Sequence, residues 1–288
     1  MMTRARLAPV LALAAAVALA GCQTGNRDRE NRLAYVERPV EQLYNEARDQ
    51  LERRNWEPAV QLFEEVERQH PYSEWARRSM LMAAYGSYMQ NRYEAAISNS
   101  QRFISLHPGN SAAAYAYYLI AISYFEQIVD VGRDQRMTEL ALAALNDVVQ
   151  RFPDSEYARD ARLKIDMTRD QLAGKEMEVG RFYLRQDEHL AAIGRFRRVI
   201  ELYQTTSHTP EALHRLVEAY VSMGVTREAT QIAAVLGYNY PGSEWYEASF
   251  NLLQSRGLQP ARADKGDPGF FERLSDRVFR RNSEPKPN

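Results

Sequence analysis

The sequence predicts an all-α fold: a solenoid of about five helical hairpins, with a long helix that joins the third repeat to the fourth. Three observations support this prediction. A small residue recurs along the chain and is followed, twelve positions later, by a residue that breaks helices. A bulky apolar residue lies four positions after that small residue in three of the repeats and seven positions after it in all five, which is the spacing of one helix face. Between the third and fourth repeats, residues 155–186 contain no proline.

The composition is that of a folded chain without a bulk attraction to nucleic acid. The 288 residues are 45% hydrophobic and 26% charged, and the formal net charge is -1. No nucleic-acid partner is therefore expected. Cys22 is the single cysteine, which excludes an internal disulfide framework and a zinc site built on several cysteines.

Residues 1–21 have the pattern of a secretory signal peptide. Arg4 and Arg6 precede an apolar run of about 14 residues, which is too short to span a bilayer permanently. Leu-Ala-Gly stands directly before Cys22, and these four residues resemble the bacterial lipobox at every position. The resemblance implies cleavage before Cys22 and attachment of S-diacylglycerol and N-acyl (palmitate) lipid, with no other cofactor. A plain signal peptide with a chance cysteine is the alternative interpretation.

The residues after Cys22 predict where the anchored protein lies. Gln23 follows, not Asp, and under the sorting rule that the lipobox resemblance implies this points to the outer membrane. Stable anchoring needs more than one acyl chain, and the resemblance implies three, held in the inner leaflet with the protein facing the periplasm. Residues 22–38 are polar without an apolar period and are interpreted as a lipidated tether.

Five segments carry the repeat. The small residues and the positions of their breakers are Ala59 and Pro71, Ala96 and Pro108, Ala141 and Pro153, Ala192 and Gln204, and Ala229 and Pro241. Proline prevents a helix from continuing, so each pair delimits the second helix of a hairpin, and only Gln204 departs from proline. Another compact residue, twelve positions before the alanine, marks the first helix in four units: Ala47, Ala84, Gly180 and Val217. In the third unit Ala121 lies twenty positions before Ala141, so eight residues are inserted there.

This pattern resembles the tetratricopeptide repeat, which has a small residue at its eighth position, tyrosine at its eleventh, alanine at its twentieth and proline at its thirty-second. Tyr183 and Tyr220 occupy the tyrosine position, whereas Gln50 and Ser87 replace it in the first two units. Apart from the two insertions, unit starts lie 37 residues apart in place of 34. The resemblance implies a solenoid with a concave groove that holds peptides or partner proteins. An irregular helical domain is the alternative.

The repeats fall into two groups. Fourteen extra residues separate units three and four, or about four helical turns at 3.6 residues per turn, so the helical phase is kept. One helix of about 30 residues is therefore predicted there, with Gly174 as its candidate bend. Residues 39–153 are assigned to repeats 1–3, and residues 154–258 to the long helix and repeats 4–5.

The sequence contains no recognisable catalytic or metal-binding motif. Its histidines, none in an HExxH or other ligand spacing, are His70, His107, His189, His208 and His214. Gly174-Lys175 is followed by Glu176, where a phosphate-binding loop needs Ser or Thr. The chain is not expected to be an enzyme or to bind a metal.

One family is resembled in more detail. The segment PDSEY, starting at Pro153, is followed by LAGKEMEVGRFY, starting at Leu172. These segments are similar to the P-x-S-x-Y and L-A-x-x-E-x-x-V-(G/A)-x-(F/Y)-Y patterns of the BamD family of outer-membrane assembly lipoproteins, and HPYSEWA in the first unit fits as well. The resemblance extends from Cys22 to about Leu258.

The resemblance implies a non-catalytic scaffold of the β-barrel assembly (BAM) machinery that tethers, captures and hands over its substrates. The implied partners are the periplasmic domains of BamA, other BAM lipoproteins and unfolded outer-membrane β-barrel proteins with aromatic-ended signals. By position, the C-terminal repeats would face BamA. Arg195, Arg197 and Arg198 are candidate contacts, because guanidinium groups pair with carboxylates. A solvated helix face is the alternative for each.

The N-terminal repeats would form the substrate groove. Tyr85, Tyr88 and Tyr117 are the groove candidates, because aromatic rings and hydroxyls suit peptides that end in aromatic residues. Packing between helices is the alternative for each tyrosine. The alternative function is a periplasmic repeat-lipoprotein adaptor for cell-wall enzymes.

Residues 259–288 lie outside the resemblance and are interpreted as a flexible tail with a short basic amphipathic helix. Its apolar stripe consists of Phe270, Phe271, Leu274, Val278 and Phe279. Four arginines lie mostly opposite this stripe: Arg273, Arg277, Arg280 and Arg281. Docking on the solenoid end, a protein partner or a membrane remains open, with a protein partner or no stable structure favoured over lipid.

Overall fold

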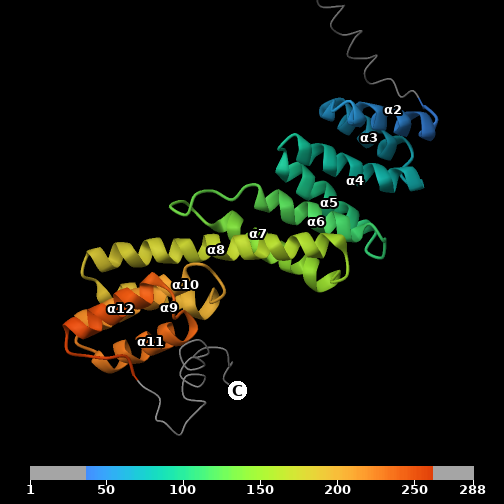
Figure 1. Cartoon of the computed structure of the whole chain (residues 1–288). Coiled ribbons are helices and arrows are strands. Elements are labelled where there is room, and N and C mark those ends of the chain that lie inside the picture. The colour runs from blue at the N-terminus through green and yellow to red at the C-terminus, as the bar shows by residue number, and fades with distance from the viewer. Residues whose placement is uncertain (1–36, 262–288) are drawn as a thin grey trace, which may run out of the picture.

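The computed structural model describes residues 37–261, which form eleven α-helices and no strand. The helices are α2 (Val40–Glu52), α3 (Trp56–Gln69), α4 (Glu74–Met89), α5 (Tyr93–Leu106), α6 (Ala113–Phe125), α7 (Arg136–Arg151), α8 (Glu156–Arg185), α9 (His189–Leu202), α10 (Thr209–Ser222), α11 (Thr226–Asn239) and α12 (Glu244–Ser255). Successive helices pack as hairpins that stack into an elongated solenoid (Figure 1), which confirms the predicted tetratricopeptide-type fold. The signal peptide, Cys22, most of the tether and the amphipathic tail segment lie outside the described residues.

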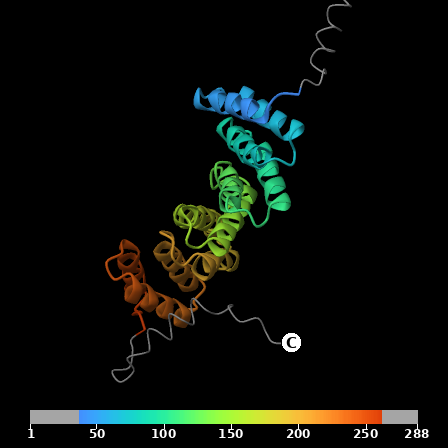
Figure 2. The ribbon, with the colours of Figure 1, turned by 90° about the vertical axis from the view of Figure 1, so that its right-hand side faces the viewer.

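The first helices of the hairpins form one continuous row. Helices α2, α4, α6 and α8 contact one another in succession, and each also packs against the second helix of its own hairpin. Figure 2 shows the hairpins following one another from the blue N-terminal end to the red C-terminal end. Side chains on α4, α6 and the start of α8 are therefore brought together although they are far apart in sequence.

Four hairpins use the same turn. In each of them the second residue after the first helix has a left-handed backbone conformation: Arg54 (φ 60°), Asn91 (φ 58°), Asp187 (φ 59°) and Gly224 (φ 74°). The next amide donates a hydrogen bond to a carbonyl five residues back, as from Arg92 to Ser87 at 3.0 Å, which completes a Schellman cap. Only Gly224 adopts this conformation without a steric penalty.

A Pro-x-Ser sequence connects three of the hairpins to the next helix. After each proline a serine caps the following helix: Ser73 for α4, Ser155 for α8 and Ser243 for α12. The Ser73 hydroxyl accepts a hydrogen bond from the amide of Ala76 at 3.0 Å and donates one to the carbonyl of His70 at 2.8 Å. Such a cap contributes typically about 1 kcal/mol to helix stability. One short motif therefore ends one helix and starts the next.

The recurring small residues are the points of closest helix approach. All five alanines of the second helices are completely buried: Ala59, Ala96, Ala141, Ala192 and Ala229. Phe63, Leu145 and Phe196, each four residues after one of these alanines, are completely buried as well. Gly180 plays the same part in α8, because a Cβ atom there would lie 2.5 Å from the ring of Phe196.

The long helix is present as α8, which has 30 residues. Two loops hold its middle. From the α6–α7 connection, which contains the predicted insertion, the carbonyl of Val129 accepts a hydrogen bond from Gln171 Nε2 at 2.7 Å. From the α9–α10 connection, Ser207 donates to Asp170 Oδ1 through its amide and its hydroxyl, at 3.1 and 2.8 Å. Gly174 lies where both loops approach, since a Cβ there would be 3.2 Å from a Val131 methyl and 3.3 Å from His208 Nε2.

The two halves are packed differently. Residues from Ala173 to Leu253 share one continuous hydrophobic core that connects α8 through α12. The described part before α8 has smaller separate clusters, such as the one around Phe63 and the one around Leu145. Because each N-terminal cluster belongs to adjacent hairpins only, this half has the nearest-neighbour stability of a repeat array.

A pair of glycine substitutions tests the close approach at Gly180. Gly194→Ala on α9 meets no atom within 4 Å and should raise the free energy of unfolding by about 0.5–1 kcal/mol, because alanine has the higher helix propensity. Gly180→Ala forces its methyl into the Phe196 ring, and overpacking of this kind typically costs about 1–3 kcal/mol. Chemical denaturation of both variants should therefore show Gly180→Ala as the less stable; equal stabilisation would contradict the close packing.

Candidate binding surfaces

Five tyrosines gather on the row of first helices. They are half-buried and form what we call the tyrosine row: Tyr85 and Tyr88 on α4, Tyr115 and Tyr118 on α6, and Tyr157 at the start of α8. The ring of Tyr157 lies 5.5 Å from that of Tyr115 and 5.2 Å from that of Tyr118. These separations are typical of favourable aromatic pairs. The row therefore offers ring faces and hydroxyl groups within one surface.

Acidic side chains accept hydrogen bonds from the ends of this row. Tyr88 donates its hydroxyl to Glu126 Oε1 at 3.3 Å, and Tyr118 donates to Asp160 Oδ2 at 2.5 Å. Burial, together with the nearby Glu126 carboxylate, raises the pKa of Tyr88 to about 12. Burial also raises the pKa of Tyr115 and Tyr118. All three remain neutral hydroxyl donors at physiological pH.

Tyr117 does not join the tyrosine row. It lies on another side of α6, where its ring is 5.5 Å from that of Phe152 and 5.1 Å from the Arg151 guanidinium carbon. There it lines a hollow of about 510 Å³ between α5 and α7, together with Ile104, Tyr124 and Leu140 among others. The structure thus brings Tyr85 and Tyr88 together and places Tyr117 on a separate surface.

The three candidate arginines of α9 differ in their surroundings. Arg195 Nη1 lies 3.2 Å from Glu176 Oε2, and Arg198 Nε lies 3.0 Å from Glu176 Oε1. Glu176 on α8 is only 8% exposed, so the two arginines clamp a buried carboxylate. Arg197 pairs within its own helix, with Glu201 Oε1 at 3.5 Å. Arg195 and Arg198 therefore tie α9 to α8, whereas the ion pair of Arg197 is local.

A second polar network ties α10 to its neighbours. Glu211 on α10 pairs with Arg181 of α8 at 2.9 Å and with Arg215 at 3.3 Å, and the Arg215 guanidinium lies over the Trp245 ring of α12 at 5.5 Å. Buried His214 shares a hydrogen bond of 2.8 Å with the hydroxyl of Ser249 on α12. Burial, reinforced by Arg215, lowers the pKa of His214 below its usual value. This half therefore has both an apolar core and cross-helix polar links.

Residues 37–261 contain neither a metal site nor a membrane span. No group of histidine, cysteine or carboxylate side chains in this range is arranged to hold a metal ion. None of the described helices combines the length and apolar character needed to cross a membrane.

The fold defines the class of the protein, a helical-repeat solenoid of the tetratricopeptide type that carries a row of tyrosines in one half and cross-helix ion pairs in the other. The profile of the outer membrane lipoprotein family YfiO matches residues 36–236. An outer membrane protein assembly factor BamD from Caulobacter vibrioides is 60% identical over 88% of this chain and 82% of its own, and one from Rickettsia prowazekii is 44% identical over 82% and 92%. The chain belongs to the BamD family of outer-membrane protein assembly factors.

Solved structures similar to this chain include that of a thermophilic TPR protein from Thermus thermophilus. The match covers 73% of this chain and 98% of that one, with a TM-score of 0.36 and 18% sequence identity.

The candidates chosen from the sequence did not include three members of the tyrosine row: Tyr115, Tyr118 and Tyr157. The available signal was the three-residue spacing of Tyr85 and Tyr88, and of Tyr115 and Tyr118, which puts each pair on one helix face. The side of α6 that faces α4 and α8 became known only from the packing. The Glu176 clamp gave no comparable signal, because its partners lie 19 and 22 residues away on another helix.

The Glu176 clamp can be tested by two substitutions. Glu176→Gln removes the charge that both arginines share and places an amide donor beside them. Discounted for the partial exposure of the arginines, the loss in unfolding free energy should be about 1–2 kcal/mol. The control Arg197→Ala breaks a partly buried pair within one helix, and because such i,i+4 pairs contribute about 0.3–0.5 kcal/mol, it should change stability by less than Glu176→Gln. Equal losses of unfolding free energy in the two variants would show that the ion pairs of Glu176 contribute no more than the local pair of Arg197.

A pH series tests the environment of His214. Because its pKa is lowered in the fold, the neutral ring stabilises the protein above the unfolded pKa of about 6.5, and this contribution is lost as the pH falls toward the folded pKa. His214→Gln should therefore flatten the dependence of Tm on pH between about 7 and 5.5. An unchanged slope in the variant would contradict the assignment.

Proposed function

We propose that this chain is a lipid-anchored periplasmic scaffold that captures unfolded outer-membrane β-barrel proteins and presents them to BamA. Membership in the BamD family supports the assembly role, and the tyrosine row is the observation that carries the capture step. The anchor is the acylated Cys22 in the inner leaflet of the outer membrane. The other lipoproteins of the assembly complex are further proposed partners.

Capture follows from the chemistry of the tyrosine row. An unfolded barrel precursor exposes aromatic side chains and unpaired backbone groups. Half-buried tyrosine rings offer flat apolar contacts, each aromatic pair adding about 0.5–1.5 kcal/mol beyond buried area. The hydroxyl oxygens of Tyr88 and Tyr118, whose protons are donated to Glu126 and Asp160, can accept hydrogen bonds from backbone amides of the substrate. Such contacts are individually modest, so the substrate can be released again. Binding and release without covalent chemistry suit a scaffold that hands its substrate on.

Docking to BamA is assigned to the C-terminal half. Its hydrophobic core is continuous from α8 to α12, which supports a preformed docking surface. Arg197 is the arginine of α9 best suited to reach a partner carboxylate, because Arg195 and Arg198 are engaged with Glu176. A partner carboxylate would need to replace only the local contact between Arg197 and Glu201.

Binding of a barrel-derived peptide tests the capture surface. The double variant Tyr88→Phe, Tyr118→Phe keeps the rings and removes the two hydroxyl oxygens that would accept from a bound peptide. At about 0.5–1.5 kcal/mol for each lost hydrogen bond, affinity for a peptide ending in an aromatic residue should fall about tenfold in fluorescence anisotropy. Tyr72→Phe is the matched control, since Tyr72 is 98% exposed in the α3–α4 turn. Equal affinity in all three proteins would contradict capture at the tyrosine row.

The cellular role is tested by depletion. Loss of the protein should lower the amount of β-barrel proteins in the outer membrane, and Arg197→Ala should recover less BamA in a pull-down while binding the peptide normally. If barrel proteins persist and cell-wall enzymes co-purify, the adaptor hypothesis is correct and the proposed function is wrong.

A further inference from the structure

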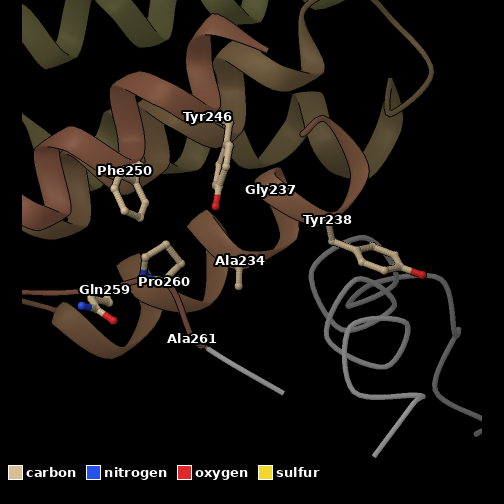
Figure 3. A pocket seen from close by; sticks show the side chains of 8 residues that line it. All are labelled: Ala234, Gly237, Tyr238, Tyr246, Phe250, Gln259, Pro260 and Ala261. Atoms are coloured by element: carbon tan, nitrogen blue, oxygen red, sulfur yellow. The ribbon is translucent and has the colours of Figure 1, made fainter. Parts of the chain in front are cut away.

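The C-terminal end of the solenoid contains a hollow of about 430 Å³ whose lining includes three aromatic side chains. Its walls are α11 and α12, and the stretch of chain after α12 closes one side. Figure 3 shows Tyr246 and Phe250 pointing from α12 toward Pro260 and α11. Phe250 is 39% exposed and Tyr238, at the far end of the hollow, is 57% exposed. The end of the solenoid therefore presents aromatic surface to solvent.

Helix α12 is a first helix without a second one. Every other first helix of the described chain is followed by a second helix that packs against it. After α12, Gly257 turns the chain with φ 70°, and the described residues end at Ala261 without a further helix. Terminal units of repeat proteins normally carry a polar cap, because nothing stacks on their outer face. The hollow is the place that such a cap would cover.

The chain itself leads into this hollow. Pro260 and Ala261 line it, and the Ala261 amide donates a hydrogen bond of 3.0 Å to the carbonyl of Thr230 on α11. From Thr230 to Tyr238, α11 is about 12 Å long at 1.5 Å per residue. This is roughly the length of two turns of a second helix packed alongside it. The next residues in the sequence therefore start beside a hollow that is about two helical turns long.

The sequence of residues 270–281 has the amphipathic pattern of a helix that packs one face against a protein surface. Phe271, Leu274 and Val278 follow at spacings of three and four, on one face of a helix. Twelve residues compare with the 14 of second helices such as α9 and α11. The eight residues from 262 to 269 can span at most about 30 Å, well beyond what is needed to reach the hollow.

We propose that residues 270–281 form an intramolecular cap that seats their apolar stripe in the hollow between α11 and α12, as the missing second helix of α12. A linker of this length gives an effective concentration in the millimolar range. Even a weak contact with a dissociation constant of about 0.1 mM would then be occupied about ten to one. The cap shields Tyr246 and Phe250 and completes a sixth hairpin.

Hydrogen–deuterium exchange on the full mature chain tests this proposal, with Cys22→Ser to omit the lipid. Amides of residues 270–281 should exchange about tenfold more slowly than in a free peptide of that sequence. Phe250→Asp in the hollow and Leu274→Asp in the cap should each abolish the protection. Leu163→Asp, at a 66% exposed position of α8, is the matched control and should leave it unchanged.

The remaining outcomes overturn the proposal. Unprotected residues 270–281 in the wild-type chain, or protection that survives both Phe250→Asp and Leu274→Asp, would show that the segment does not dock in the hollow. Protection that disappears on dilution, together with a dimeric mass, would assign the hollow to a second copy. Protection that requires phosphatidylglycerol vesicles would assign the segment to a membrane. Faster exchange in α2–α10 of the Phe250→Asp variant would mean that this substitution destabilises the solenoid itself. The result for Leu274→Asp, which is outside the described residues, then decides whether the segment docks.

Discussion

Close approach of helices at small, completely buried residues is the constraint on which the rest of the structure depends. At Ala59 and its four repeat equivalents a side chain larger than a methyl group has no space, so the two helices of a hairpin meet at a fixed place. The bulky residue four positions later then fills the space beside that contact, as Phe196 does against Gly180. Each buried CH₂ group of such a residue contributes about 0.8 kcal/mol to stability. The small residue sets the distance between the two helices, and the bulky residue supplies most of the buried apolar area. The tyrosine row exists because this packing aligns α4, α6 and α8.

Helix α8 connects the N-terminal group of repeats to the C-terminal group. A free helix of 30 residues would be a weak connection, but its middle is held from one side by the α6–α7 loop and from another by Ser207. Gly174 allows both loops to approach, which explains why the smallest residue stands there. The eight-residue insertion of the third unit, which the sequence shows only as an irregular spacing, supplies the Val129 carbonyl for this contact.

Most of the fold could be predicted from the sequence because its determinants are local and periodic. Alanine and proline spacing identified the hairpins, and the absence of proline identified α8. The candidate site was less predictable, because the role of a side chain depends on its neighbours in space. Tyr117 and Tyr118 are adjacent in sequence, yet Tyr117 lines the hollow between α5 and α7, whereas Tyr118 belongs to the tyrosine row. Arg195 and Arg198 have the residue type that binds partners, but Glu176 of another helix occupies them.

The same long helix carries parts of both proposed binding surfaces. Tyr157 and Asp160 lie in its first turns and belong to the tyrosine row, whereas Glu176 lies further along and holds the arginines of α9. From Asp160 to Glu176 the helix rises by about 24 Å at 1.5 Å per residue. Because α8 is hydrogen-bonded along this whole distance and braced at its middle, the two surfaces are kept at a fixed separation. Under the proposed function, a substrate released from the tyrosine row would therefore always start from the same place relative to a partner bound at α9.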